Sequence, residues 1–359
     1  MAKKDKTYQS ALHEKDGIDP PKTLSKDSAI SIKSKRQKQP SVDDLVEGIT
    51  SGNITALSRA ITLVESTNKA HTDKARNIIT ACLPYANKSI RIGITGVPGV
   101  GKSTFIEAFG TYLTSIGKKV AVLAVDPSST LSKGSILGDK TRMEDLVKDE
   151  NAFIRPSPSG NSLGGVARKT RETIVLCEAA GFDIIIIETV GVGQSETTVH
   201  SMVDFFLLLK LAGAGDELQG IKRGIIEMAD AIIINKADGS NLKAAKSAKV
   251  EFNRALHLYP SKASGWSPKV TLCSALKKVG IADAWNLIKD YCEITTSNQY
   301  FEHNRNNQNK FWLLQTIDEH LKSNFYESPK IKLELQKQID LVEAGKTTPF
   351  AAAEYLLSL

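Results

Sequence analysis

The chain has 359 residues, of which 41% are hydrophobic and 24% charged, a balance typical of a soluble globular protein with room for roughly two domains. The net charge is +7, but residues 1–40 carry ten Lys/Arg and five Asp/Glu, so the remaining chain is close to +2. The folded part is therefore not expected to bind nucleic acid through a basic surface. No apolar run approaches the ~20 residues that a membrane span needs, so no membrane partner is expected.

Residues 1–40 form a basic tail with few large apolar side chains, and we predict that it is disordered because it cannot bury enough surface to offset its ordering entropy. The tail has no apolar segment of the secretory type, and acidic residues such as Asp5 and Glu14 argue against a mitochondrial presequence. The four cysteines are dispersed along the chain. We therefore expect a reduced, cytoplasmic protein.

A helical segment is predicted over residues 41–85. Ser41 and Asp44 have the spacing of a capping box at a helix start. Apolar residues then recur at helical spacing, first as Leu57, Ile61 and Val64 and again as Ala75, Ile78, Ile79 and Cys82.

From residue 90 the pattern changes to short apolar runs that alternate with helical stretches. The runs are 91–96, 118–126, 182–189, 204–213, 230–238 and 269–275. Unbroken runs of this kind indicate strands covered on both faces, as in a parallel sheet between helices. We predict a doubly wound α/β domain with a mostly parallel sheet over residues 86–295.

A C-terminal helical region is predicted over residues 296–359. One amphipathic helix is marked by Leu314, Ile317, Leu321 and Phe325, and a second, after Pro329, by Leu335, Ile339 and Val342, ending near Gly345. These helices could pack on their own domain as a hairpin. We favour a dimerisation arm, because little else in the sequence would cover their apolar stripes.

Residues 96–103, "GVPGVGKS", have the pattern of a phosphate-binding loop between a strand and a helix. The glycines allow backbone amides to point at phosphate oxygens, and the helix N-terminus adds a positive dipole. Lys102 is expected to reach the β and γ phosphates, and the Ser103 hydroxyl to bind Mg²⁺. The predicted phosphate-binding residues are Gly96, Val97, Pro98, Gly99, Val100, Gly101, Lys102, Ser103 and Thr104.

The base is predicted from "NKAD", residues 235–238, which follows a buried strand. One carboxylate, Asp238, can accept both donors on the edge of guanine, whereas adenine would present a lone pair to it. Lys236 can cover the face of the base, and Asn235 can brace the loop. Ser274, Ala275 and Leu276 follow another strand, where a backbone amide can donate to the guanine carbonyl. The sequence therefore favours GTP and GDP over ATP.

Loops that sense the γ phosphate are predicted after two other strands. Asp126 and Glu188 end strands and can hold Mg²⁺, and the Gly191 amide can contact the γ phosphate. Val192 follows Gly191, and Gln194, a candidate to orient water, comes later, so we expect slow hydrolysis that a partner accelerates. The predicted catalytic residues are Lys102, Asp126, Asp139, Glu188 and Gln194, and the predicted metal ligands are Ser103, Asp126, Asp139 and Glu188. Four basic residues could stabilise the negative charge of the transition state or could lie in solvent-exposed loops, and the sequence does not rank them: Arg142, Arg155, Arg168 and Lys222.

At these residues the chain resembles the MeaB/ArgK-type GTPases, chaperones associated with methylmalonyl-CoA mutase. The matching stretches are "GITGVPGVGKST", "VAVLAVDPSS", "GSILGDKTRM", "PSPSGNSLGGVA", "ETVGVGQSE", "GAGDELQGIKRGI", "NKAD" and "CSAL", within about residues 85–285. The resemblance implies a homodimer joined through its C-terminal helices. It also implies a partner, an adenosylcobalamin-dependent acyl-CoA mutase, whose cofactor loading the GTPase gates and which it protects from inactivation. Loops 134–143, 182–197 and 213–224 would then couple nucleotide state to the mutase.

Other functions remain open at this stage. A metal-insertion GTPase for a nickel enzyme would have a similar domain, but the six histidines and four cysteines are scattered. A protein-targeting GTPase that reads signal peptides would need a methionine-rich groove, whereas the chain has only four methionines. A kinase for a transport protein would need ATP, against which the NKAD loop argues. A nucleotide sensor without relevant hydrolysis is the last alternative.

Overall fold

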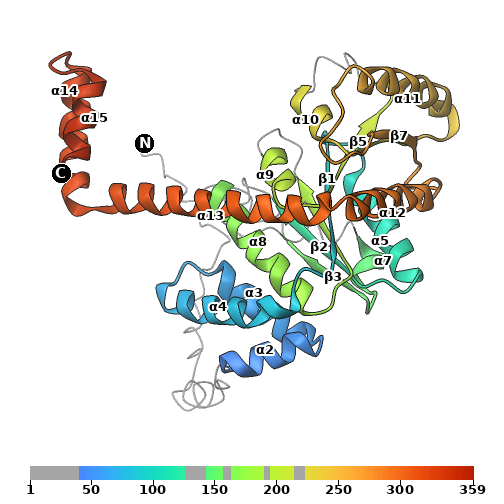
Figure 1. Cartoon of the computed structure of the whole chain (residues 1–359), viewed down its shortest axis with the longest axis horizontal. Helices are drawn as coiled ribbons and strands as arrows, with labels where there is room; N and C mark the ends of the chain where they lie inside the picture. Colours follow the sequence, from blue (N-terminus) through green and yellow to red (C-terminus); the bar gives the residue numbers. More distant parts are fainter. Residues whose placement is uncertain (1–39, 126–142, 157–162, 190–194, 214–222) are drawn as a thin grey trace, which may run out of the picture. The chain divides into compact units, whose positions relative to one another are not determined.

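Seven parallel strands form the central sheet of this computed structural model (Figure 1). The structure describes residues 40–125, 143–156, 163–189, 195–213 and 223–359, so the predicted disordered tail lies outside the described residues. The chain divides into two units, residues 1–41 and 42–359, and the fold is that of the second. The strands are β1 (Ile90–Gly96), β2 (Val120–Val125), β3 (Ala152–Arg155), β4 (Ile184–Thr189), β5 (Phe205–Leu211), β6 (Ala231–Asn235) and β7 (Lys269–Leu272).

The strand order is β3-β2-β4-β1-β5-β6-β7, and every neighbouring pair is parallel. The first strand of the chain therefore lies in the interior of the sheet. β2 and β3 lie on one side of it, with β4 inserted between β1 and β2, and β5, β6 and β7 follow on the other side. In a sheet of this kind the crevice at the carboxyl ends of the strands, where the order reverses, is the usual ligand site. The predicted doubly wound α/β class is confirmed.

Helices cover both faces of the sheet. One face packs against α5 (Lys102–Ser115), α7 (Glu144–Val147) and α12 (Ile281–Ser297). The other packs against α8 (Leu163–Ala179), α9 (Glu196–His200), α10 (Arg223–Met228) and α11 (Leu242–Leu256). Neighbouring residues of a strand point to opposite faces, so Ile184 and Ile186 join the first core and Ile185 and Ile187 the second.

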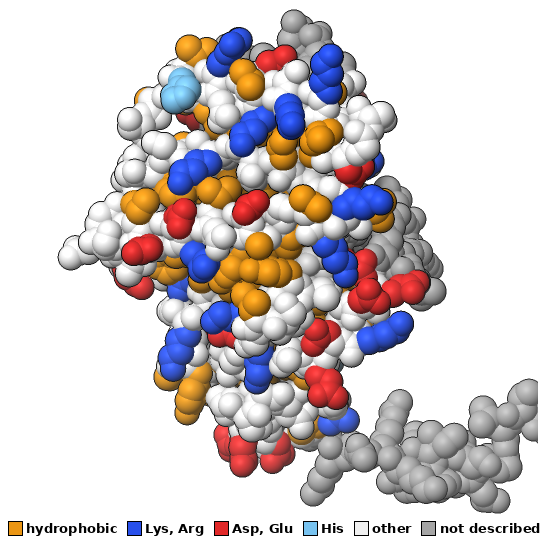
Figure 2. Space-filling view, turned by 90° about the vertical axis from the view of Figure 1, so that its right-hand side faces the viewer, with side chains coloured by type: hydrophobic (Ala, Val, Ile, Leu, Met, Phe, Trp, Pro, Cys, Tyr) orange, Lys and Arg blue, Asp and Glu red, His pale blue; other side chains and the backbone are white. Residues whose placement is uncertain are grey.

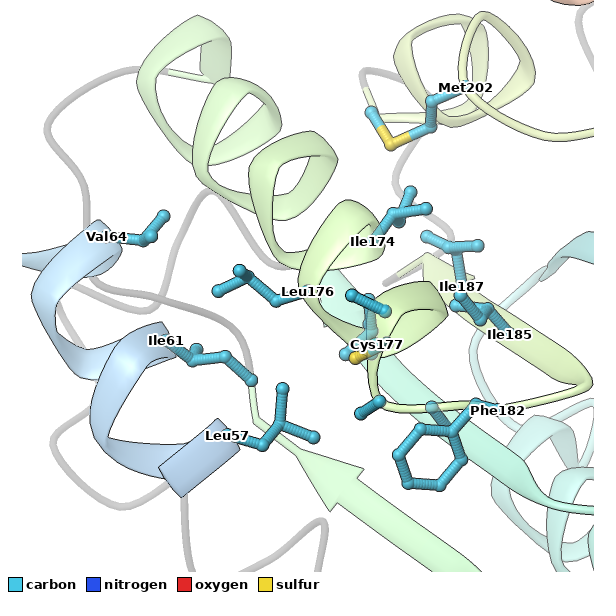
Figure 3. Packing of buried hydrophobic residues seen from close by; sticks show 14 of the residues in the cluster. Leu57, Ile61, Val64, Ile174, Leu176, Cys177, Phe182, Ile185, Ile187 and Met202 are labelled. Carbon is cyan, nitrogen blue, oxygen red and sulfur yellow. The ribbon is translucent and has the colours of Figure 1, made fainter. Parts of the chain in front are cut away.

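The N-terminal helices add a further layer over α8. They are α2 (Val42–Thr50), α3 (Ile54–Glu65) and α4 (Lys69–Cys82), followed by the short η1 (Leu83–Tyr85). Asn53 caps α3 by accepting hydrogen bonds from the amides of Thr55 and Ala56. Figure 3 shows Leu57 and Ile61 of α3 beside Leu176 and Cys177 of α8, and all four belong to one buried cluster.

The C-terminal region consists of α13 (Tyr300–Glu327), α14 (Pro329–Glu343) and α15 (Pro349–Leu357). The predicted break at Pro329 is where α14 begins, and the predicted stop at Gly345 has a left-handed φ of 64° that favours glycine. The first half of α13 lies against the α/β domain, since Trp312 donates to the carbonyl of Ser201 at 3.1 Å and Gln308 to that of Val203 at 2.7 Å.

Buried ion pairs hold the N-terminal ends of β1 and β5 to two helices. Arg305 of α13 donates to both carboxylate oxygens of Asp204, at 2.8 and 2.7 Å, and Arg91 of β1 donates to both oxygens of Glu178 in α8, at 2.8 and 3.0 Å. All four side chains are less than 5% exposed. Bidentate geometry of this kind is what makes burial of both charges tolerable.

The sequence did not predict two elements, the strand β3 and the helix α15. The apolar run of β3 has only three residues, 152–154, before Arg155, so it is too short to stand out. α15 starts at Pro349, is rich in alanine and buries only Ala352 and Leu356.

The surface carries both signs of charge. In the face that Figure 2 shows, Lys and Arg side chains alternate with Asp and Glu around a small hydrophobic area. Among the residues that the structure describes, no helix is long and apolar enough to cross a membrane.

Candidate nucleotide-binding site

The loop from β1 to α5 is shaped by three glycines. A Cβ at Gly96 would lie 2.6 Å from the carbonyl oxygen of Leu209 in β5, so only glycine permits this approach of the two backbones. Gly101 has a left-handed φ of 92°, and a Cβ there would lie 2.9 Å from Nδ2 of Asn235. Gly99 also has a left-handed φ, of 81°. The loop therefore turns tightly at the carboxyl end of β1 and leads directly into the N-terminus of α5.

Lys102 lies at the centre of this loop. Its ammonium donates to the carbonyl of Gly96 at 2.8 Å and to that of Val97 at 3.4 Å. Burial lowers the pKa of Lys102, while the nearby carboxylates of Glu188 and Glu196 act in the opposite direction. Ser103, also in the first turn of α5, is half-buried, and Thr104 is exposed.

Asn235 connects the phosphate loop to the loop after β7. It is 1% exposed, its Nδ2 donates to the carbonyl of Val100 at 2.9 Å, and its Oδ1 accepts from the amide of Ala275 at 3.2 Å. A buried amide with both ends bonded is held in one orientation. The structure thus brings together three segments that are separated in the sequence by 135 and 40 residues.

The other residues of the NKAD sequence lie beside this bridge. Lys236 adopts a left-handed φ of 57°, unusual for a side chain of its size, and its ammonium donates to the carbonyl of Gly99 at 2.9 Å. Asp238 is half-buried and accepts a hydrogen bond from the hydroxyl of Ser274. Leu276 is 77% exposed. A carboxylate, a long aliphatic stem and the backbone of the loop after β7 therefore surround the predicted position of the base.

Glu188 reaches the same edge of the sheet from β4. It lies opposite Ile94 of β1 in the strand register, and the next residue, Thr189, donates through its hydroxyl to that of Thr95 at 2.8 Å. The Glu188 carboxylate and the Ser103 hydroxyl are oxygen donors of the kind that Mg²⁺ prefers. The residues present at this end of β1 and β4 therefore fit a hydrated Mg²⁺ ion.

Several predicted site residues cannot be placed. Asp126, Asp139, Gly191 and Gln194 lie outside the described residues, as do Arg142 and Lys222. Their roles stay predictions.

Two of the arginines that were candidates to stabilise charge have other partners. Arg155, at the end of the edge strand β3, pairs with Glu65 of α3. Arg168 of α8 pairs with Glu172 one turn on, at 3.2 Å, and lies 3.4 Å from the ring of His320 in α13. Both arginines therefore hold elements together: Arg155 joins β3 to α3, and Arg168 lies between α8 and α13.

The sequence analysis overlooked Glu196. This first residue of α9 is 1% exposed, and its carboxylate acts on the charge of Lys102 together with Glu188. A carboxylate is rarely so deeply buried without a charged neighbour. The only signal in the sequence was its place in "VGQSE", where one acidic residue follows a glycine-rich stretch.

Comparisons with known proteins agree with this geometry. A family model described as methylmalonyl Co-A mutase-associated GTPase MeaB matches residues 57–330. A putative GTPase of Caulobacter vibrioides is 49% identical over 317 residues, covering 88% of this chain and 97% of that protein. The GTPase ArgK of Escherichia coli is 47% identical over 281 residues, covering 78% and 85%.

Two further matches extend the comparison. The mitochondrial methylmalonic aciduria type A homolog of Mus musculus is 43% identical over 342 residues, covering 92% of this chain and 82% of that protein. A crystal structure described as LAO/AO transport system kinase has a TM-score of 0.73 and 37% identity, covering 88% of this chain and 96% of that one. The family match spans well over half of the chain, and relatives of high identity cover nearly all of it. The chain is a GTPase and belongs to the MeaB family of methylmalonyl Co-A mutase-associated GTPases.

Proposed function

We propose that the chain binds GTP with Mg²⁺ at the loop between β1 and α5, and that the state of this nucleotide controls an adenosylcobalamin-dependent acyl-CoA mutase of the methylmalonyl-CoA mutase type. In this role the GTPase gates the loading of the mutase cofactor and protects the mutase from inactivation. The observation that carries the nucleotide part is the Asn235 bridge, which joins the phosphate loop at Val100 to the base loop at Ala275.

The phosphate part of the site is the loop 96–104. Backbone amides after Gly96 and the N-terminus of α5 would bind the β phosphate, and Lys102 would neutralise charge that moves onto the β–γ bridging oxygen. Lys102 would exchange its present bonds to the loop carbonyls for phosphate oxygens. Glu196 would keep the Lys102 ammonium charged although it is buried.

The base part of the site is Asp238 with the loop after β7. The Ser274 hydroxyl holds the Asp238 carboxylate, which can accept the two donors of guanine. Because the amides of Ser274 and Ala275 donate to Val279 and Asn235, the Leu276 amide is the one that would donate to the guanine carbonyl. Adenine offers neither pattern, so its binding would leave polar groups without partners.

Mg²⁺ would be held by Ser103 and, through water, by Glu188, with Asp126 and Asp139 as further predicted ligands. When bound, this ion supplies charge stabilisation to the β and γ phosphates. The chain's own contribution is to hold the oxygen donors in place, which it does through the Thr189–Thr95 bond between the ends of β4 and β1.

The mutase part of the proposal is supported by the description of the matching family and by the name of the mouse relative. Slow hydrolysis accelerated by this partner would follow from Val192 occupying the position after Gly191. The compartment of this chain stays a prediction, cytoplasmic from its sequence, while the mouse relative is named as mitochondrial.

The test is to mix the full chain with purified methylmalonyl-CoA mutase and measure GTP turnover and complex formation by gel filtration. We expect a stable complex and a GTPase rate at least about tenfold above that of the chain alone, a barrier change of about 1.4 kcal/mol. Asp238→Asn, supplied with xanthosine triphosphate, should respond to the mutase in the same way, since only the base changes. Absence of both complex and stimulation with cobalamin-dependent acyl-CoA mutases would contradict the chaperone role while leaving GTP binding intact.

A transport-protein kinase is the second candidate, because the structurally similar crystal structure carries that description. A kinase of this kind would use ATP, and the discriminating measurement is nucleotide affinity. We expect GTP and GDP to bind at least about 100-fold more tightly than ATP and ADP, as hydrogen-bond mismatch at a buried edge implies. Tighter binding of ATP would favour the kinase.

A further inference from the structure

A cavity of about 770 Å³ lies at the opposite end of the sheet from the nucleotide site. Its wall includes Asp204 and Asp230, the residues that precede β5 and β6, whereas the phosphate loop follows the carboxyl end of β1. Helices α9, α10, α11, α12 and α13 contribute the remaining wall, together with the segment between α11 and β7 (Figure 1). This volume is in the range of sites that take small organic ligands and cofactors.

Of the Asp, Glu and Lys side chains of the wall, Asp204, Asp230 and Lys262 are paired within the protein, and Glu227 is at an exposed position. Lys262 donates to one carboxylate oxygen of Asp230 and to the carbonyls of Met228 and Ala229, all at 2.8 Å, which uses the three hydrogens of its ammonium. Asp204 is held by Arg305. With both ion pairs closed and Glu227 a carboxylate, this wall offers an anionic ligand no unpaired lysine or arginine among the described residues, so an anion would lose its hydration without replacement.

Neutral polar groups of the wall, by contrast, are not used by the fold. Several side chains of the wall have polar atoms without a hydrogen bond among the residues that the structure describes, and they include His200, Asn253, Tyr259, Tyr291, Tyr300 and Asn304. Tyr291 is the clearest case, because it is only 3% exposed and a buried phenol normally finds a partner. A ligand with matching donors and acceptors would supply these partners.

Aromatic surfaces complete the wall. Trp266 is 2% exposed and its ring stands edge-on to Tyr291, with centroids 5.7 Å apart, and its indole N–H is already spent on the carbonyl of Asp230. The ring of His200 stands edge-on to Phe206, at 5.5 Å. These buried rings form the floor, and the half-buried rings of His200, Tyr259 and Tyr300 keep accessible surface on which a flat partner can stack or meet them edge to face.

We propose that this cavity is a second ligand site, which binds a planar heterocycle of about nucleoside size that has no anionic group and carries hydrogen-bond donors and acceptors. The closed ion pairs and Glu227 select against negative charge, the unused phenol, imidazole and amide groups select for polarity, and the accessible rings select for a flat shape.

The site is connected to the nucleotide site through α9. Thr197 and His200 of this short helix line the cavity, while Val199 of the same helix packs on Gly93 of β1, the strand that leads into the phosphate loop with Lys102. A ligand that shifts α9 therefore changes the surroundings of Lys102, and by linkage the nucleotide changes the affinity for that ligand by the same factor.

The test uses the full chain saturated with GDP and Mg²⁺, so that the probes cannot enter the nucleotide site. Three uncharged planar probes, adenine, adenosine and riboflavin, are titrated by calorimetry, with AMP as a charged counterpart of adenosine. At least one uncharged probe should bind with a Kd of about 1 mM or tighter, a free energy of about −4 kcal/mol, and adenosine should not be weaker than AMP.

Two variants locate the binding. Tyr300→Phe removes one hydroxyl from the wall and should raise the Kd about tenfold, whereas Tyr355→Phe, on α15 and outside the cavity, should not change it. Ala263→Trp places a large ring in the cavity from an exposed position and should abolish binding. Thermal unfolding and GDP affinity of each variant show whether it is folded, and if Ala263→Trp is not, Tyr300→Phe and Asn304→Ala decide.

Three results would overturn the proposal. These are no binding by any uncharged probe, binding of AMP in preference to adenosine, and binding that Tyr300→Phe and a folded Ala263→Trp leave unchanged. The link to the nucleotide is tested separately: a bound probe should change GDP affinity in the wild-type chain but not in Ala263→Trp. If the probe binds and GDP affinity stays the same, the site stands and its coupling through α9 is wrong.

Discussion

At the scale of single residues, the site depends on polar side chains that hold loops or other side chains in position. Asn235 joins two loops, and Ser274 orients the Asp238 carboxylate. The motif patterns predicted which residues gather here, since "GVPGVGKS" and "NKAD" are local sequences at strand ends. They did not predict Glu196, because a buried carboxylate is recognised only once the groups around it are known.

Asp238→Asn tests the assignment of the base. An asparagine would present a donor to one of the two donors of guanine, so we expect GTP affinity to fall about 10- to 100-fold, as for 1–3 kcal/mol of unmatched polar groups. Xanthosine nucleotides, which carry a carbonyl at that position, should bind better than to the wild-type chain. Affinity is measured by calorimetry, with Asp318→Asn on the exposed side of α13 as the control. Unchanged GTP affinity in Asp238→Asn would show that another residue selects the base.

Glu178 predicts how stability depends on pH. Burial by itself raises the pKa of Glu178, but its bonds from Arg91, Asn87 and Ser89 outweigh burial and hold the pKa below its ordinary value of 4.5. The unfolded chain therefore takes up a proton before the folded chain does. The contribution of this pair is complete above about pH 4.5 and is lost as the pH falls below that value.

In Glu178→Gln we expect a lower free energy of unfolding at neutral pH, by about 3–5 kcal/mol, because Arg91 loses its buried partner. Between about pH 5 and pH 3 the variant should lose less stability than the wild-type chain, since it lacks this titrating group. Urea unfolding across this range measures both effects. Glu343→Gln, at an exposed position, is the control and should show the same dependence of unfolding free energy on pH as the wild-type chain. If the curve of Glu178→Gln runs parallel to that of the wild-type chain, other carboxylates are responsible for the loss of stability at acid pH.

At the scale of elements, the contacts of one strand or helix with the next decide where the site forms. β1 is flanked by β4 and β5, and the close approach of Gly96 to Leu209 sets the angle at which the chain leaves the sheet for the phosphate loop. Unbroken apolar runs predicted six of the seven strands correctly. They missed β3, whose four residues depend on pairing with β2 rather than on their own pattern.

Gly96→Ala tests this approach. The added Cβ would lie 2.6 Å from a backbone oxygen that cannot move without breaking the sheet, so we expect a loss of about 1–3 kcal/mol of stability and a marked loss of GTP affinity. Gly224→Ala is the matched control, since a Cβ there meets nothing within 4 Å and its φ is ordinary. Thermal unfolding and nucleotide calorimetry are compared for both. If Gly96→Ala binds GTP like the control, the loop geometry tolerates a side chain and our account of it is wrong.

Arg305→Met tests how α13 is held. The change removes the partner of Asp204 and the bonds to the carbonyls of Asn87 and Ser89, and it leaves a buried carboxylate without its counter-ion. We expect the free energy of unfolding to fall by about 3–5 kcal/mol. Arg254→Met, at an exposed position in the last turn of α11, should change it by less than about 0.5 kcal/mol. Equal urea midpoints for the two variants would mean that the Arg305 pair contributes no net stability.

At the scale of the whole molecule, the α/β domain is covered by its own helices, whereas the C-terminal region exposes much apolar surface. Leu313, Leu321 and Leu333 are 62%, 63% and 71% exposed, and Phe350 is 82% exposed. An apolar groove of about 520 Å³ lies among α13, α14 and α15. Exposed apolar surface of this extent usually marks an interface. We propose that this region joins two copies of the chain, as the family resemblance implies.

The expected outcome is a particle of twice the 39.0 kDa of one chain in sedimentation equilibrium. Replacing both Leu333 and Leu357 with Glu should shift the chain to a monomer, because charges would enter an apolar interface. Leu258→Glu is the control, since Leu258 is 86% exposed but lies in the α/β domain. A wild-type chain that remains a monomer at concentrations above its cellular range would contradict the homodimer.

The sequence by itself determined the fold class, the GTPase family, and the positions of the phosphate loop and the NKAD loop. All of these depend on local patterns: apolar runs, glycine spacing and short motifs at strand ends. Only the tertiary structure decided the Asn235 bridge, the Arg305–Asp204 and Arg91–Glu178 pairs, the buried position of Glu196 and the second cavity. The reason is physical: whether a charge or amide is satisfied depends on partners about 40 to 135 residues away, and no local pattern records which of them the packing brings near.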